Sequence, residues 1–105
     1  MTGKNTSIKY SIVHRMMFQA YIVEFFSTMF FVYVLLATGN PLAIGATLAL
    51  VTLLTHSISG GYVNPAVTLV MSSAGQLPSA DVIPYCLAEV FGGLVALEIY
   101  KRVKT

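Results

Sequence analysis

The sequence predicts an all-α membrane protein with three transmembrane helices and one re-entrant half-helix. Of the 105 residues, 56% are hydrophobic and 10% are charged, a composition typical of a chain that lies in lipid. Lys and Arg occur only in the two end segments, and none lies between Met16 and Tyr100. The intervening sequence contains three apolar segments long enough to cross a bilayer and one of about half that length.

The first predicted span covers residues 16–37 and the second covers residues 42–58. Gly39-Asn40-Pro41, between them, is a tight-turn signal. Gly45 and Ala49 on the second span are four residues apart, a spacing that permits a close helix contact. A basic segment before an apolar run is also a feature of signal peptides, but the first run is too long for one and contains Glu24.

A half-helix is predicted over residues 63–71, directly after the helix breaker Ser59-Gly60-Gly61. Asn64 can cap its first N–H groups, and Pro65 at the first helical position has no N–H to leave unpaired. At about 1.5 Å per residue this segment crosses only about half of the bilayer. A polar helix start at membrane depth is tolerated where it lines a cavity or is buried in protein. This segment therefore indicates the architecture of a channel.

The third predicted span covers residues 82–100 and follows a polar return loop over residues 72–81. Gly92 and Ala96 on this span again lie four residues apart. Glu98 precedes Arg102 by four residues, so we expect these two side chains to form an ion pair at the membrane interface.

Two carboxylates, Glu24 and Glu89, lie inside predicted spans. A charge there is costly and normally faces the interior of the helix bundle with a partner. The structural interpretation is that each carboxylate accepts N–H groups from the broken region between Ser59 and Asn64 and holds it in place. The functional alternative is coupling to a proton or a cation.

Several classes of protein are disfavoured. Cys86 is the only cysteine, so we expect neither an intrachain disulfide nor a Cys-based metal site. The net charge of +2 comes from the flanks and indicates contact with lipid headgroups rather than nucleic acid. His56 and Ser57 form no triad with an acid at a readable spacing, and no nucleotide-binding loop is present. The sequence thus predicts no enzyme, no cofactor and no metal.

Three stretches resemble the aquaporin and aquaglyceroporin family. They read Val-Glu-Phe-Phe-Ser-Thr at residues 23–28, Ile-Ser-Gly-Gly-Tyr-Val-Asn-Pro-Ala-Val-Thr at residues 58–68, and Ala-Glu-Val-Phe-Gly-Gly at residues 88–93. The resemblance implies half of an aquaporin-like fold, similar to the first of the two repeats in that family. It also implies passive transport of water or a small neutral solute such as glycerol, with Asn64, Pro65 and Ala66 at the pore.

The chain departs from the family pattern at positions that would line the pore. Val67 follows the motif where the second repeat of the family has Arg, and Ile44 stands where water-selective members have an aromatic residue. Ser57 stands where His is common, and Glu89 stands where Gln is usual. The candidates for pore lining or for the filter are Ile44, His56, Ser57, Tyr62 and Val67.

One copy of this unit cannot enclose a pore, and the two repeats of the family are related by inversion in the membrane plane. Each predicted membrane face carries three basic residues, which gives no positive-inside preference. They are Lys4, Lys9 and Arg15 on one face and Lys101, Arg102 and Lys104 on the other. We therefore predict an antiparallel, dual-topology homodimer in the lipid bilayer, alone or within a higher oligomer. The alternative is that these residues serve merely as membrane anchors.

Two rival functions stay open. One is a small proton-coupled exporter that uses Glu24 as its coupling carboxylate, although such an exporter has no need of a re-entrant half-helix. The other is a non-conducting membrane scaffold or truncated paralogue, an interpretation that the missing filter Arg keeps open. All three interpretations place the chain in a membrane as a multi-pass protein.

Overall fold

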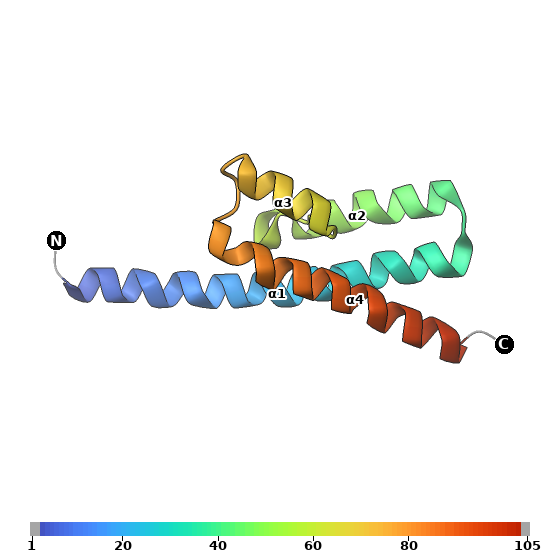
Figure 1. The fold of residues 1–105 in the computed structure, drawn as a ribbon, viewed down its shortest axis with the longest axis horizontal. Coiled ribbons are helices and arrows are strands. Elements are labelled where there is room, and N and C mark those ends of the chain that lie inside the picture. Colours follow the sequence, from blue (N-terminus) through green and yellow to red (C-terminus); the bar gives the residue numbers. More distant parts are fainter. Residues whose placement is uncertain (1–2, 104–105) are drawn as a thin grey trace.

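The computed structural model describes residues 3–103, and the side chains of residues 16–103. This part of the chain is helical throughout apart from short connections (Figure 1). The helices are α1 (Gly3–Thr38), α2 (Pro41–Ser59), α3 (Pro65–Ser73), the 3-10 helix η1 (Ser79–Asp81) and α4 (Val82–Val103). The predicted all-α class is therefore confirmed. The side chains of Lys4, Lys9 and Arg15, and the whole of Lys104, lie outside the described residues.

Three helical segments are long and apolar enough to cross a membrane. They are Met16–Thr38 within α1, Pro41–Ser59, and Ser79–Val103. The predicted number of spans is confirmed. The helix that contains the first span begins at Gly3, well before residue 16, because no proline and no further glycine interrupts residues 4–15.

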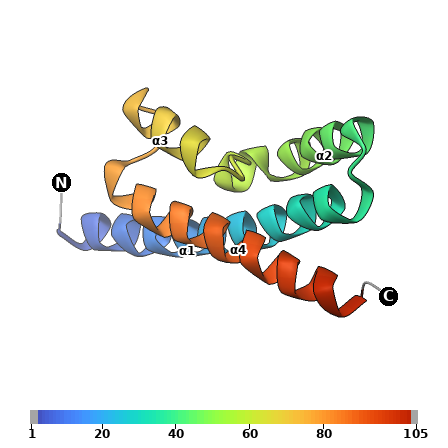
Figure 2. The same ribbon diagram turned by 45° about the vertical axis from the view of Figure 1, so that its right-hand side comes forward.

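The helix α3 is re-entrant in its path. Figures 1 and 2 show it beginning near the middle of the molecule and running back toward the end that carries the N-terminus. It packs on α4, while α1 packs most extensively on α4 and then on α2. The N-terminus and the turn after α3 lie at one end of the bundle, and the α1–α2 turn and the C-terminus lie at the other (Figure 1). This is the arrangement that three spans and a half-span require.

The two pairs of small residues four apart have different surroundings. A Cβ on Gly92 would lie only 2.4 Å from the Phe25 carbonyl oxygen, so α4 approaches α1 this closely because residue 92 has no side chain. Ala96, one turn later, is fully buried. A Cβ on Gly45 would meet nothing within 4 Å. The close contact that the sequence suggested for Gly45 and Ala49 is therefore not made within the chain.

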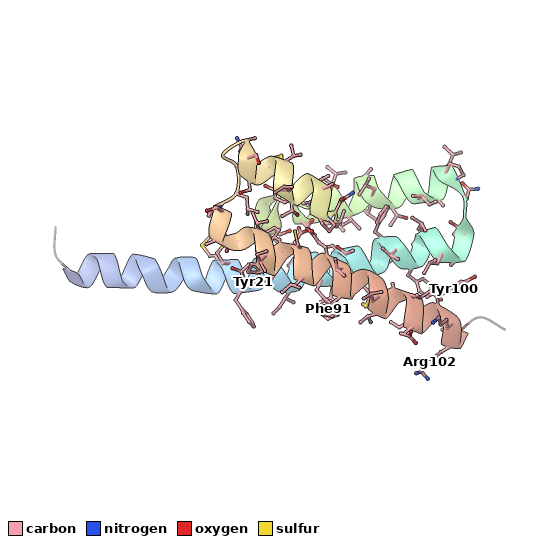
Figure 3. All side chains as sticks on the ribbon, viewed as in Figure 1. Tyr21, Phe91, Tyr100 and Arg102 are labelled. Atoms are coloured by element: carbon pink, nitrogen blue, oxygen red, sulfur yellow. The ribbon has the colours of Figure 1, made fainter. Side chains whose placement is uncertain are left out.

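The ion pair near the end of α4 uses a different partner from the one predicted. The Lys101 ammonium lies 3.4 Å from Glu98 Oε1, and Figure 3 shows the Arg102 side chain pointing away from the bundle. Positions three and four residues apart are both neighbours on a helix, so spacing alone could not choose between them. The outer face of α4 also presents Phe91 (Figure 3), which is 55% exposed.

Candidate functional site

The start of α3 is built by Asn64 and Pro65. Asn64 has an extended backbone, with φ −158° and ψ 124°, and its side-chain Oδ1 accepts the Ala66 N–H at 2.8 Å. Its carbonyl oxygen accepts the Thr68 N–H at 2.9 Å and so begins the helix. Because the cap uses the oxygen of the side-chain amide, the amide nitrogen keeps its two hydrogens for an external acceptor. Asn64, Pro65 and Ala66 are all exposed in a single copy.

The loop that leads to Asn64 contains three residues with positive φ. Gly60 has φ 93° and Gly61 has φ 66°, while Val63, a β-branched residue, has φ 46°. Glycine adopts this region without steric cost, whereas a β-branched residue is strained there. Val63 is the only such non-glycine residue in the part of the chain that the structure describes. Contacts from outside the loop must therefore stabilise the strained backbone conformation of Val63.

Glu24 on α1 supplies those contacts. Its side chain is fully buried. Its Oε2 accepts the Ser59 hydroxyl at 2.6 Å and the Tyr62 N–H at 3.2 Å. Its Oε1 accepts the N–H of the strained Val63 at 2.8 Å. The first span thus holds the segment immediately before Asn64.

Glu89 on α4 holds the other side of Asn64. The Thr68 hydroxyl, in the first turn of α3, lies 2.9 and 2.8 Å from the two Glu89 carboxyl oxygens. Glu89 is 2% exposed, and its carboxyl also contacts the Glu24 carboxyl and the Asn64 backbone N–H. Two carboxyl groups from different spans therefore meet beneath the half-helix and fix its start from both sides.

A cluster of Tyr62 with Tyr21 and Tyr85, two residues that sequence reasoning missed, supports the same loop. The Tyr85 hydroxyl donates to the Ser59 carbonyl oxygen at 2.8 Å, and the Tyr21 hydroxyl donates to Asp81 Oδ1. The Tyr21 and Tyr62 rings lie 5.9 and 5.8 Å from that of Tyr85, and Figure 3 marks Tyr21 beside the start of α4. The available signal was helical spacing, because Tyr21 precedes Glu24 by three residues and Tyr85 precedes Glu89 by four. A buried tyrosine also requires a partner for its hydroxyl.

A cavity of about 490 Å³ lies between the end of α2, the loop and α3. Three of the predicted pore-lining residues, His56, Tyr62 and Val67, are among those that line it. Ser57 is exposed and does not line it. Ile44 lies in the first turn of α2, about 18 Å from His56 along the helix axis. The structure thus brings together three candidates and leaves two elsewhere.

Metal binding finds no support in the described residues. Among these residues no group of three or more His, Cys, Asp or Glu side chains is placed to hold an ion. The polar groups around the start of α3 are instead backbone amides, hydroxyls, the Asn64 side-chain amide and the two carboxyls.

Comparison with known proteins gives one family. The family model described as "Major intrinsic protein" matches residues 36–105. "Aquaporin Z" of Brucella melitensis biotype 1 is 44% identical over 61 residues, which are 58% of this chain and 27% of that protein. "Glycerol uptake facilitator protein-like 6" of Lactiplantibacillus plantarum is 38% identical over 85 residues, 72% of this chain and 39% of that protein. "Aquaporin Z" of Photorhabdus laumondii subsp. laumondii is 38% identical over 61 residues, 58% of this chain and 26% of that protein.

The chain therefore spans between about a quarter and two fifths of the length of these curated relatives. No solved structure matches it.

Proposed function

Because the chain belongs to the major intrinsic protein family and is an integral multi-pass membrane protein, we propose that it forms a passive channel for water or small neutral solutes. The relatives named above are aquaporins and a glycerol uptake facilitator. The observation that carries the proposal is the half-helix α3. It presents an exposed Asn64 whose side-chain N–H groups are not used by the helix cap.

The chemistry of this helix start suits a neutral solute that accepts hydrogen bonds. The first N–H groups of a helix form the positive end of its dipole, and the Asn64 amide adds donors at the same place. A water or alcohol oxygen accepts from these donors, while a cation is repelled by the positive end. A water oriented in this way also interrupts a chain of proton transfers.

A complete pore requires a second half-helix, and we propose that a second, inverted copy supplies it. The outward side chains of α3 are apolar and exposed in a single copy, with Val67 40%, Leu69 57% and Val70 63% exposed. The open surface at Gly45 provides a place for close helix contact. The equal number of basic residues on the two predicted faces favours neither orientation, as an inverted pair requires.

The proposed pore discriminates weakly among small neutral solutes. Val67 and Ile44 are apolar; the second repeat of the family has Arg after the motif, and water-selective members have an aromatic residue at the position of Ile44. One strong donor and one source of cation repulsion are then missing. The constriction should be wide enough to pass glycerol as well as water. Asn64 should therefore carry a larger share of the selectivity than in relatives that have the Arg.

Stopped-flow light scattering on proteoliposomes containing the full chain tests this function, with protein-free liposomes as the control. We expect osmotic water flow and glycerol uptake to be faster with the protein, without proton flux. If neither solute moves faster, the chain is a scaffold. Transport that requires a proton gradient would instead support an exporter that uses Glu24.

A further inference from the structure

The carboxyl groups of Glu24 and Glu89 form a pair that passive conduction does not explain. Both groups are almost completely buried, with 0% and 2% exposure, and they contact one another. We propose that Glu89 is a neutral acid that shares one proton with Glu24, and that this proton positions Asn64. This inference goes beyond the proposed channel, because it holds whether or not the chain conducts.

The donors around Glu24 are those of an ionised carboxylate. Three hydrogens point at its two oxygens, from the Ser59 hydroxyl and from the Tyr62 and Val63 N–H groups. An ionised carboxylate only accepts hydrogen bonds, and several such donors favour the charged form. The negative charge of the pair therefore belongs to Glu24.

The surroundings of Glu89 are those of a neutral acid. Two donors face Glu89, fewer than the three at Glu24: the Asn64 N–H and the Thr68 hydroxyl, whose single hydrogen serves both Glu89 oxygens at 2.9 and 2.8 Å. The contact with the Glu24 carboxyl joins two groups that are acceptors when ionised. A proton on Glu89 supplies the missing hydrogen and turns this contact into a hydrogen bond.

Among the side chains that the structure describes, no cation neutralises a second charge at this depth. The sequence has no Lys or Arg between residues 16 and 100, and His56 is exposed on α2. Tyr62 in the loop and Tyr85 on α4 face Glu24, and Cys86 on α4 faces Glu89. The helices α2 and α3 contribute only the Ser59 and Thr68 hydroxyls. Two adjacent buried carboxylates without a cation are strongly disfavoured, so the pair keeps one proton.

The proton couples two spans to the pore residue. Glu24 holds residues 62 and 63, while Glu89 holds the Asn64 N–H and the Thr68 hydroxyl. Loss of the shared proton would place two like charges in contact and drive α4 away from α1 at this level. The start of α3 would then lose one of its two anchors. Glu89 is thus a positioning residue for Asn64.

Infrared spectroscopy of the full chain in lipid tests this proposal. We expect a protonated-carboxyl stretching band at neutral pH that disappears in Glu89→Gln. The matched control is Glu98→Gln, because Glu98 lies on the same helix but is 59% exposed and paired with Lys101; that variant should keep the band. Absence of the band from the parent, or its persistence in Glu89→Gln, would overturn the proposal.

The pH dependence of unfolding gives a second readout. The folded pair holds a proton that unfolded glutamates release above about pH 4.3. The folded state then binds more protons than the unfolded state, so stability must fall as pH rises. The unfolding equilibrium constant should increase by up to about tenfold per pH unit in the parent and Glu98→Gln until the pair releases its proton. Glu89→Gln should lose this slope.

A merely structural Glu89 would give parent and Glu89→Gln the same pH profile, which would contradict the proposal. If Glu89→Gln does not fold, the infrared spectrum and the pH profile of the unsubstituted protein still test the proposal. A band together with falling stability supports the shared proton, whereas a flat profile in the parent rejects it.

Discussion

The helices α2 and α3 begin in the same way, but in very different surroundings. Asn40 caps α2 by accepting the Leu42 and Ala43 N–H groups at 2.9 and 3.1 Å, and Pro41 occupies the first helical position. Asn64 caps α3 by accepting one N–H, that of Ala66, and Pro65 occupies the first position of that helix. Each start also follows a left-handed glycine, Gly39 with φ 55° and Gly61 with φ 66°.

The difference lies in what surrounds these two starts. A Cβ on Gly39 would meet nothing within 4 Å, whereas one on Gly61 would lie 2.8 Å from Thr55 Oγ1. Asn40 lies in an exposed turn between two spans, while the chain around Asn64 is held by buried carboxyls from α1 and α4. The Asn-Pro cap is therefore a generic helix start. The tertiary contacts of Glu24 and Glu89 make the second one a re-entrant site.

The largest expected effect comes from removing the acceptor that distinguishes the second start. Glu24→Leu leaves the donors of Ser59, Tyr62 and Val63 without their acceptor, at a cost of about 1–3 kcal/mol for each buried group. Glu24→Gln retains one carbonyl oxygen and should lose much less stability. For comparison, Asn40→Ala at the first start should cost about 1 kcal/mol. Chemical denaturation in detergent would compare the three variants.

Equal losses for Glu24→Leu and Glu24→Gln would show that hydrogen bonding to Glu24 does not hold the loop. If instead Glu24→Gln stays folded but abolishes proton-driven transport found in the parent, the carboxylate is a coupling group.

A smaller difference is expected between the two left-handed glycines. Gly39→Ala should cost about 1 kcal/mol, because only the backbone conformation opposes it. Gly61→Ala should cost about 1–3 kcal/mol more, since its Cβ would also lie 3.1 Å from the Thr52 Cα, and a backbone atom cannot easily move away. Thermal unfolding of the two variants side by side measures this gap. A gap of zero would mean that the loop is not packed against α2.

The smallest effect on stability, but a selective effect on transport, is expected from Asn→Asp at the two caps. Asp caps a helix as well as Asn and interacts favourably with the helix dipole, so neither variant should be much less stable than the parent. Asn64→Asp places a negative charge at the proposed constriction, and it should raise cation leak and lower discrimination against protons. Asn40→Asp should leave the fluxes of water, glycerol and protons unchanged. If a folded Asn64→Asp variant also leaves them unchanged, Asn64 does not face a conducting path.

The features that could be predicted from sequence are those set by local chemistry and by the membrane. Apolar length predicts three spans, and Asn64 followed by Pro65 predicts a helix start. A carboxylate inside a span demands a partner, which predicts that Glu24 accepts hydrogen bonds from the backbone N–H groups of the loop. For Gly39-Asn40-Pro41 the same reasoning gave only a turn, although Asn40 and Pro41 form the same cap.

The remaining features depend on tertiary structure. The sequence predicts a partner in the loop for each buried carboxyl, but it could not predict that Glu24 and Glu89 meet, because that depends on how α1 crosses α4. The crossing depends in turn on Gly92 lying against the Phe25 carbonyl. The positive φ of Val63 opposes its own preference, so only the hydrogen bond from Val63 to Glu24 explains it. Local propensity cannot predict a conformation that distant residues impose.

Disulfide cross-linking tests most directly the central claim that two inverted copies bring their half-helix starts together. In a Cys86→Ser background, Ala66→Cys would be compared with Leu42→Cys, since both residues follow an Asn-Pro cap and both are exposed. Identical residues near a two-fold axis can come within the roughly 7 Å between Cα atoms that a disulfide needs. We predict a covalent dimer for Ala66→Cys in liposomes and none for Leu42→Cys, whose two copies would lie on opposite membrane faces about 30 Å apart. A covalent dimer through Leu42→Cys, with Ala66→Cys remaining monomeric, would contradict the inverted pair.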